Sequence, residues 1–439
     1  MSLSEVGLIL GEILPDLPVR GFAIDSRLVS PGFVFFALKG ETVDGHDFLR
    51  EVASKGVICA VVSLSCTQDI PGLYFIKVKD PLQSLHKLAK WRMSQKKLRC
   101  IAVTGSVGKT TTKEFVATLL EGAFEVRKTP GNANSQVGLP LSILNLESGG
   151  DVFVAEMGMS SPLEITSLLE VAPPQFVIVT KIALAHALYF PGGIEEIAKA
   201  KAEILQHSHT KKAFINVQAR QFQAFQEKRN VEQVFYGLEA DPFTQKEDIL
   251  LRKKDGFFSF QGVRDFTLPF TAGHFSENFL VAALVARELG MDWELIFQQA
   301  MKLIPYKMRF EKIEKEGVTY INDAYNANPE SVKAALQNLP MPAQGKKTVA
   351  VLGEMRELGS FSQKAHREIG QMASKHADLL LCLAGDASYM AEEFSFSGKK
   401  AQFFHSLKDL QEALKYQVEE GDVVLVKASK SLKMWEVLE

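Results

Sequence analysis

A glycine-rich stretch, Thr104-Gly-Ser-Val-Gly-Lys-Thr-Thr111, carries residue types that bind phosphate. An apolar run precedes it and a helical pattern follows it, so the stretch predicts a strand, a turn and the start of a helix. Backbone N–H groups and the helix dipole would attract phosphate, Lys109 would add a mobile charge, and the Thr110 hydroxyl could bind Mg²⁺. The general loop pattern has a glycine where Val103 stands, and the extra glycine here is Gly105. The alternative is an ordinary strand-turn-helix corner.

Two possible metal ligands stand at the ends of later apolar runs. Glu156 ends the run that starts at Val152, and His186 lies just beyond the run 176–180. In parallel sheets, ligands bind at the carboxyl ends of the strands. Each residue alone is more often structural, as a solvated carboxylate or a satisfied histidine. Together with Thr110 they could form a Mg²⁺ site.

A lysine falls on an apolar helix face in the segment 194–205. The face is formed by Ile194, Ile197, Ala198, Ile204 and Leu205. On a period of 3.6 residues Lys201 lies in the middle of this face, and Lys199 lies nearly opposite. A buried lysine must be paired, have a lowered pKa or be chemically modified, because an unpaired buried ammonium is costly. The alternative is a lysine whose amine reaches the solvent along the edge of the sheet.

The elements that must position these residues form an α/β chain of three domains. Short apolar runs of strand length alternate with helical stretches, which is typical of parallel sheets covered by helices. We expect a small N-terminal α/β domain at 1–96, a central domain with the phosphate loop and a parallel sheet at 97–304, and a C-terminal Rossmann-like α/β domain at 305–439. Residues 218–272 are poorly periodic and predict strands and loops at the edge of the central sheet.

The overall composition excludes several classes of protein. The 439 residues are 46% hydrophobic and 23% charged, which is ordinary for a globular protein. The formal net charge of -2 offers no basic surface for nucleic acid. The four cysteines have no metal-binding spacing, and reduced thiols are the default. No targeting segment or membrane-length apolar run stands out, so we expect a cytoplasmic protein.

A loop near the N-terminus offers groups for an anionic ligand. Asp25-Ser26-Arg27 precedes Pro31-Gly32 and presents a hydroxyl and a guanidinium. A solvated turn is the alternative.

These motifs, taken in order, resemble the Mur ligases of peptidoglycan synthesis. The resemblance is carried by D-S-R at 25–27, D-G-H at 44–46, T-G-S-V-G-K-T at 104–110, E-M-G at 156–158, A-H at 185–186, A-K-A-K-A-E-I at 198–204, G-H-F-S-E-N at 273–278 and D-A-Y-N-A-N-P at 323–329. It covers all three expected domains.

The resemblance implies a role for each matching residue. The phosphate loop for ATP comprises Gly105, Ser106, Val107, Gly108, Lys109, Thr110 and Thr111. Thr110, Glu156 and His186 correspond to Mg²⁺ ligands, and Lys201 to a lysine carried as an N-carbamate that holds a second Mg²⁺. Lys109, Lys201, His186 and Glu156 are the implied catalytic residues. Further ATP contacts are implied for Asn278, Arg309, Asp323 and Asn328, and contacts with a UDP-linked substrate for Ser26, Arg27 and Asn134.

The resemblance also implies a reaction. ATP would drive the joining of D-alanyl-D-alanine to a UDP-N-acetylmuramoyl-tripeptide through an acyl phosphate, in a monomer that needs no nucleic acid and no membrane span. The loop 325–329 and the triplet 357–359 favour this step of the pathway. Two alternatives are another ATP-dependent amino-acid or peptide ligase of the same fold, such as another Mur step or a folylpolyglutamate synthetase, and a nucleotide-driven switch that makes no bond.

The chain departs from the family pattern at four places. Lys181-Ile-Ala replaces N-I-G, and Ala187-Leu-Tyr-Phe replaces L-E-G-F after His186. Met308 stands where the family has a glycine before the arginine. Near the end, Ala428 replaces a glycine and Lys430 replaces an arginine, and a lysine cannot form the bidentate fork of an arginine.

Overall fold

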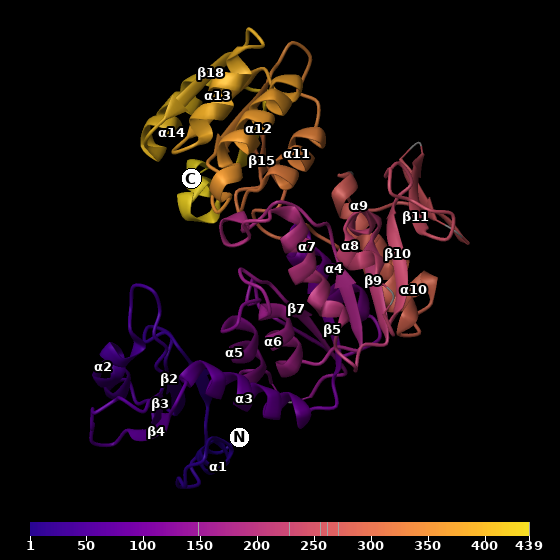
Figure 1. Ribbon diagram of the computed structural model, residues 1–439. Helices are drawn as coiled ribbons and strands as arrows, with labels where there is room; N and C mark the ends of the chain where they lie inside the picture. Colours follow the sequence, from indigo (N-terminus) through magenta and orange to yellow (C-terminus); the bar gives the residue numbers. More distant parts are fainter. Residues whose placement is uncertain (148, 228, 255, 261, 271, 439) are drawn as a thin grey trace. The chain divides into compact units, whose positions relative to one another are not determined.

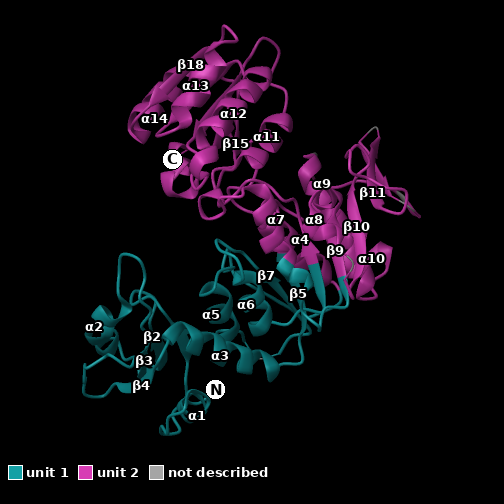
Figure 2. Cartoon of the chain, in the orientation of Figure 1, with its two compact units in different colours: residues 1–103, 123–177, 203–212 teal, residues 104–122, 178–202, 213–439 magenta. Residues whose placement is uncertain are grey.

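The computed structural model describes residues 1–147, 149–227, 229–254, 256–260, 262–270 and 272–438. The chain divides into two compact units (Figure 2). Unit 1 comprises residues 1–103, 123–177 and 203–212, and unit 2 comprises residues 104–122, 178–202 and 213–439. Three strands, β5 (Arg99–Thr104), β8 (Phe176–Val179) and β9 (Lys212–Asn216), have residues in both units.

Unit 1 begins with a parallel sheet in the order β1-β2-β3-β4. Its strands are β1 (Gly21–Ala23), β2 (Phe33–Phe36), β3 (Cys59–Ser63) and β4 (Tyr74–Val78), and its helices are α1 (Leu3–Leu10), α2 (Leu49–Ser54) and α3 (Pro81–Ser94). Alternate residues of the strands, including Phe35, Ala60 and Val62, form one core with Leu49 and Val52 of α2. The apolar runs read from the sequence here are therefore strands, as predicted.

The rest of unit 1 is a parallel arrangement with β7 between β5 and β6. The elements are β6 (Val126–Lys128), β7 (Val152–Glu156), α5 (Gly138–Leu144) and α6 (Glu164–Val171). Every residue of β7 is buried, which explains why the strand reads as a continuous apolar run instead of an alternating one. Its last residue is Glu156, a predicted metal ligand.

Unit 2 contains the helix that follows the phosphate loop and an extended series of strands. The helices are α4 (Lys109–Leu120), α7 (Ile194–Ala202), α8 (Gln223–Gln226), α9 (Gly273–Glu288) and α10 (Trp293–Ala300). The strands are β10 (Glu232–Leu238), β11 (Ile249–Lys254), β12 (Phe257–Phe260) and β13 (Val263–Phe266). β10 and β11 are parallel, whereas β11, β12 and β13 are antiparallel neighbours. The strands predicted within 218–272 are confirmed for the described residues, but the range also contains the short helix α8. Residues 228, 255, 261 and 271 lie outside the described residues.

Unit 2 ends in a six-stranded sheet in the order β14-β15-β19-β16-β17-β18. Figure 1 labels β15 and β18 of this sheet. The strands are β14 (Glu311–Lys315), β15 (Val318–Asn322), β16 (Thr348–Gly353), β17 (Leu379–Leu383), β18 (Lys400–Phe404) and β19 (Val423–Lys427). Only the β14–β15 pair is antiparallel among these described strands. The helices are α11 (Pro329–Gln337), α12 (Ser362–His376), α13 (Ala387–Ser395) and α14 (Leu407–Gln417).

Both faces of this sheet are buried. In β16, Ala350 and Leu352 pack with α11, α12 and α13, while Val349 and Val351 pack with α14 and the C-terminal turns. Successive side chains of a strand point to opposite faces, so one apolar strand supplies both cores. This arrangement agrees with the expected Rossmann-like layer.

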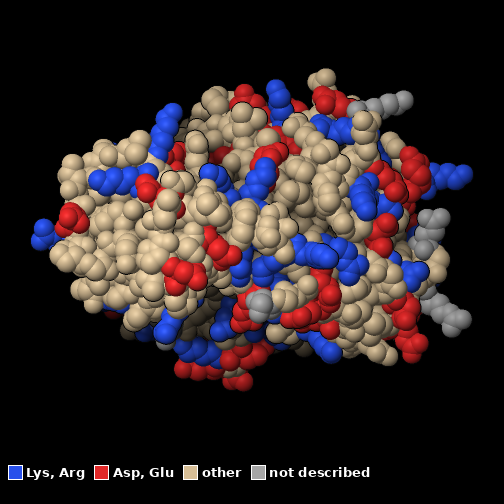
Figure 3. All heavy atoms as spheres, turned by 90° about the horizontal axis from the view of Figure 1, so that it is seen from below, with Lys and Arg blue, Asp and Glu red and all other residues tan. Residues whose placement is uncertain are grey.

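No helix in the described part of the chain is long and apolar enough to cross a membrane. Basic and acidic side chains lie interspersed over the face drawn in Figure 3. This agrees with the near-neutral net charge of the sequence.

Candidate active site

The phosphate loop is held in place by the end of β8. Gly105 has φ +142, and a Cβ atom there would lie 1.9 Å from the Thr180 hydroxyl oxygen, so only glycine fits. That hydroxyl donates to the carbonyls of Thr104 and Val107 at 3.1 and 2.7 Å. The Lys181 carbonyl accepts from the Ser106 N–H at 2.8 Å. The glycine that departs from the general loop pattern is therefore required by a neighbouring strand.

Gly108 and Lys109 complete the loop at the start of α4. Gly108 is the N-cap of α4 with φ +90, and a Cβ atom there would lie 2.9 Å from Asn278 Oδ1. The Lys109 amine folds back over the loop and donates to the Gly105 carbonyl at 2.8 Å. The N–H groups of the first helical turn are thus available above the loop, and a cation lies beside them.

Two other predicted ATP residues, Arg309 and Asn278, contact the loop and the first turn of α4. Arg309 Nη2 donates to the Thr110 hydroxyl at 3.0 Å, and the Thr112 hydroxyl donates to Asn278 Oδ1 at 3.2 Å. The Arg309 guanidinium lies 4.1 Å from the centre of the Tyr325 ring, and its buried Nε has no hydrogen-bond partner among the described residues. The structure therefore gathers Lys109, Thr110 and Arg309 where an anion could be bound.

Lys201 is buried, as its place on the helix predicts. Its relative exposure is 1%, whereas Lys199 is exposed. Burial, and secondly the charge of Lys109, hold the pKa of Lys201 well below its usual value. Within the described ranges, no hydrogen bond or ion pair reaches the Lys201 amine. The lowered pKa favours the neutral amine, which is a nucleophile, over the ammonium, which is not.

His186 contacts a residue that lies far away in the sequence. Its Nδ1 lies 2.6 Å from Glu357 Oε2. The hydrogen bond from His186 lowers the pKa of Glu357, against the opposing effect of burial. From the sequence, Glu357 stands out only as part of the triplet 357–359, and no role is predicted for its side chain. No local pattern could have revealed this contact, because the two residues are 171 positions apart.

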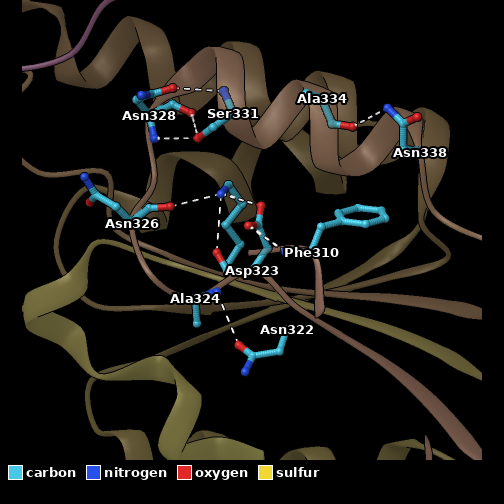
Figure 4. Close-up of polar contacts among 10 residues, drawn as sticks. Phe310, Asn322, Asp323, Ala324, Asn326, Asn328, Ser331, Ala334 and Asn338 are labelled. Atoms are coloured by element: carbon cyan, nitrogen blue, oxygen red, sulfur yellow. Dashed lines mark hydrogen bonds and ion pairs between the residues drawn. The ribbon is translucent and has the colours of Figure 1, made fainter. Parts of the chain in front are cut away.

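Asp323 and Asn328 belong to one loop (Figure 4). The buried Lys427 holds this loop in place. The Lys427 amine donates to Asp323 Oδ2 at 2.6 Å, to the Asp323 carbonyl at 3.3 Å and to the Asn326 carbonyl at 2.9 Å. Asp323 Oδ1 accepts from the Phe310 N–H, and Asn328 Oδ1 caps α11 through the Ser331 N–H at 2.9 Å. The described contacts of both residues are thus structural, and their predicted ATP contacts stay predictions.

Unit 1 brings Glu156 and Asn134 together. Asn134 Nδ2 donates to Glu156 Oε1 at 2.6 Å, and the Thr129 hydroxyl accepts from the Glu156 N–H. Glu156 is 1% exposed, and its second oxygen, Oε2, accepts no hydrogen bond from any described residue. An orphaned buried carboxylate oxygen fits a divalent cation as its missing partner.

Ser26 and Arg27 also lie in unit 1. The Arg27 side chain is 83% exposed and binds Asp25 through two nitrogens, at 2.6 and 2.9 Å. This contact lowers the pKa of Asp25 to about 2. Ser26 is buried and its carbonyl accepts from Lys55. The loop therefore presents a guanidinium at the surface, as the motif predicts.

Lys181, one of the departures from the family pattern, forms an ion pair that the sequence analysis missed. Its amine lies 3.0 Å from Glu277 Oε2, and Glu277 Oε1 accepts from Asn216 at 2.8 Å. Glu277 directly precedes Asn278 on α9. The pair therefore ties the start of α9 to the strand end that supports the phosphate loop.

These features define a class: an α/β protein that binds phosphate at a glycine-rich loop and surrounds it with charged residues from distant segments. Comparison with known proteins agrees. The Mur ligase middle domain matches residues 103–286, the Mur ligase glutamate ligase domain matches residues 308–430, and the Mur ligase family catalytic domain matches residues 18–90.

Relatives and solved structures match over nearly the whole chain. The UDP-N-acetylmuramoyl-tripeptide--D-alanyl-D-alanine ligase of Bacillus subtilis is 32% identical over 96% of this chain and 92% of its own length. The structure of MurF ligase from Thermotoga maritima in complex with ADP is 30% identical, has a TM-score of 0.81 and is matched over 97% of both chains. MurF from Acinetobacter baumannii is 26% identical with a TM-score of 0.85, matched over 100% of this chain and 97% of its own. The chain belongs to the Mur ligase family.

Proposed function

We propose that this protein joins D-alanyl-D-alanine to a UDP-N-acetylmuramoyl-tripeptide at the expense of ATP. The observation that carries the proposal is the match to the Bacillus subtilis ligase of that name, at 32% identity over 96% of the chain. The phosphate loop supports it, because Lys109, Thr110 and Arg309 lie together as ATP-dependent chemistry requires.

The reaction has two steps. A carboxylate oxygen of the tripeptide attacks the γ-phosphorus of ATP, the bond to the β-phosphate oxygen breaks, and ADP leaves with the electron pair. The amine of D-alanyl-D-alanine then attacks the acyl carbon, phosphate leaves, and the new amide nitrogen loses its proton. Lys109 and Arg309 supply positive charge where negative charge develops on the phosphoryl oxygens.

Mg²⁺ fits the residues assigned to it. Glu156 Oε2 is buried without a described partner, and the Thr110 hydroxyl accepts a hydrogen bond from Arg309. His186 Nδ1 contacts the Glu357 carboxylate. When bound, Mg²⁺ would neutralise phosphate charge and orient the transferred group. Thr110, Glu156, His186 and a carbamylated Lys201 would hold it at two sites.

The proposal includes a carbamate on Lys201, because burial lowers the pKa of this amine and favours its neutral form. The Nζ lone pair attacks the carbon of CO₂, the N–C bond forms, a C=O electron pair moves to oxygen, and the nitrogen releases a proton. The product is an anion in place of a neutral amine, which attracts the Lys109 charge and creates an oxygen ligand for a metal.

The remaining assignments complete the proposal. Residues 1–96 would bind the UDP substrate through Ser26 and Arg27. Asn134 would contact this substrate where it reaches the ATP site. Residues 97–304 would bind ATP, with Asn278 beside the adenine. Residues 305–439 would supply Arg309, Asp323 and Asn328 and bind the dipeptide. The protein would act as a cytoplasmic monomer.

A substrate-dependence assay tests this function. Phosphate release should require both the UDP-tripeptide and D-alanyl-D-alanine, and mass spectrometry should detect the UDP-muramoyl-pentapeptide. Product with L-glutamate or a diamino acid in place of the dipeptide would indicate another ligase of the family. Slow ATP hydrolysis at a rate independent of both substrates would indicate a nucleotide switch and would overturn the proposal.

A further inference from the structure

The contact between His186 and Glu357 involves two points of attachment. His186 Nδ1 lies 2.6 Å from Glu357 Oε2, and the Leu188 N–H donates to the Glu357 carbonyl at 2.9 Å. Side chain and backbone of Glu357 are both engaged with the same short segment. Its carboxylate therefore has a fixed position relative to the imidazole.

The two segments also pack closely around this contact. The turn η2 (Ala187–Tyr189) lies against the turn η5 (Gly359–Phe361). A Cβ atom at Gly359 would lie 3.2 Å from the Leu188 Cα, and one at Gly193 would lie 3.0 Å from the Phe361 ring. Small residues at both places allow this approach, and larger ones would force the segments apart.

Both partners have a backbone conformation that is unusual for residues with a side chain. His186 has φ 61 and Glu357 has φ 63. Such left-handed conformations cost about 1–3 kcal/mol each and persist where surrounding contacts impose them. Here the strained backbone turns the two side chains toward each other.

The contact determines which ring nitrogen carries the proton. A nitrogen that faces a carboxylate at hydrogen-bond distance is the N–H donor, so the neutral ring has its lone pair on Nε2. No described residue forms a hydrogen bond with His186 Nε2. The ring is therefore arranged to offer Nε2 to a ligand, as metal-binding histidines do when a carboxylate holds their other nitrogen.

We propose that Glu357 is a positioning residue for this site: it fixes the tautomer and the orientation of His186, so that Nε2 can bind the metal. The proposal rests on the proposed function, which makes His186 a Mg²⁺ ligand. Because Glu357 comes from the C-terminal segment, the metal site is complete only while the turn at 359–361 is docked on 187–189. Docking of this segment and metal affinity are thereby coupled.

Two variants separate the parts of this role. Glu357→Ala removes the acceptor, whereas Glu357→Gln keeps an acceptor of the same shape without the charge. Glu368→Gln is the matched control, because Glu368 is an exposed carboxylate of the same C-terminal segment that pairs with Lys333 at 3.6 Å and forms no described contact with His186. His186→Ala is the reference for complete loss of the ligand.

The first measurement is ¹⁵N NMR of histidine-labelled protein without metal. We expect the wild type and Glu357→Gln to show His186 protonated at Nδ1, and Glu357→Ala to show a mixture of tautomers. The second is Mn²⁺ titration followed by electron paramagnetic resonance in the presence of ADP. Loss of such an outer carboxylate weakens metal binding about 10- to 100-fold, so Kd should rise by that factor in Glu357→Ala and less in Glu357→Gln.

The outcomes distinguish this inference from the proposed function. Unchanged tautomer and Mn²⁺ affinity in Glu357→Ala, with weaker binding in His186→Ala, would overturn the inference and leave the ligase function intact. Unchanged affinity in His186→Ala would overturn the inference as well, because His186 would then not be a ligand. The function itself fails only if the wild type forms no UDP-muramoyl-pentapeptide.

Discussion

Two lysines of unit 2 are both buried, but only one of them has described hydrogen-bond partners. Lys201 on α7 is 1% exposed, and Lys427 at the end of β19 is 2% exposed. Lys427 donates to Asp323 and Asn326, whereas no described residue pairs with Lys201. Burial lowers the pKa of both amines, but the Asp323 carboxylate opposes this effect only at Lys427.

The comparison shows that burial alone does not indicate the role of a lysine. A buried ammonium with several oxygen partners fixes a loop and stays charged. Burial of an amine without partners lowers its pKa and favours the neutral form, which can react. We therefore interpret Lys427 as a structural clamp and Lys201 as the site of modification.

The largest effect should follow from removal of Lys201. We expect Lys201→Ala to lower the rate of pentapeptide formation by about 10²- to 10³-fold, the size of effect seen when one group that stabilises the transition state is lost. Lys199→Ala, two positions along the same helix but on its exposed face, should keep full activity. Mass spectrometry of the product measures both. If Lys199→Ala were inactive and Lys201→Ala active, the essential lysine would be Lys199 and not Lys201.

Removal of the clamp should affect stability and ATP binding. In Lys427→Met the Asp323 carboxylate loses its cation, and breaking a buried pair in this way costs about 3–5 kcal/mol. Urea unfolding should show the loss, and the KM for ATP should rise because the loop 323–328 is released. Lys312→Met, which removes an exposed pair with Glu314, is the control and should change little. A Lys427→Met protein as stable as the control would refute the clamp.

Many strands of this fold could be predicted from the sequence, whereas contacts between distant residues, such as those of Lys427, could not. The run from Val152 to Glu156 is a strand with the predicted bounds. Every residue of the runs 348–353 and 423–427 is also buried, and these runs form the continuously apolar strands expected of a sheet that is covered on both faces. The side of α7 that buries Lys201 followed from helical periodicity. The partners of Lys427 and His186 could not be predicted, because they lie 104 and 171 positions away.

A third prediction concerns pH and a histidine near the clamp. Burial lowers the pKa of His274 from 6.5 to about 4; Asp323 opposes this, while Lys181 and Lys427 add to it. The folded protein thus keeps His274 neutral where the unfolded chain binds a proton, so stability is lost as the pH falls from 6.5 toward 4.

The expected loss from this group is about 2 kcal/mol at pH 5 relative to pH 7.5. Urea unfolding of the wild type and of His274→Gln at the two pH values measures it, since the variant lacks this contribution. Equal pH dependence in both proteins would show that another group is responsible.

The smallest effect concerns Met308, which lies next to Arg309. Met308 has φ 58, and its carbonyl accepts from the Tyr325 N–H at 3.2 Å. Met308→Gly should remove the strain of a left-handed residue, with a net gain of about 0.5–1 kcal/mol after the entropic cost of glycine. Met308→Ala should give no such gain, because alanine keeps the Cβ atom. Thermal unfolding compares the two variants.

The proposed role of Lys201 depends most directly on its carbamate, and ¹³C NMR in ¹³C-bicarbonate tests for this group. We predict a carbamate signal in the wild type that persists in Lys199→Ala and Lys427→Met and is lost in Lys201→Ala. A wild-type protein without the signal, or a signal that survives in Lys201→Ala, would contradict the account.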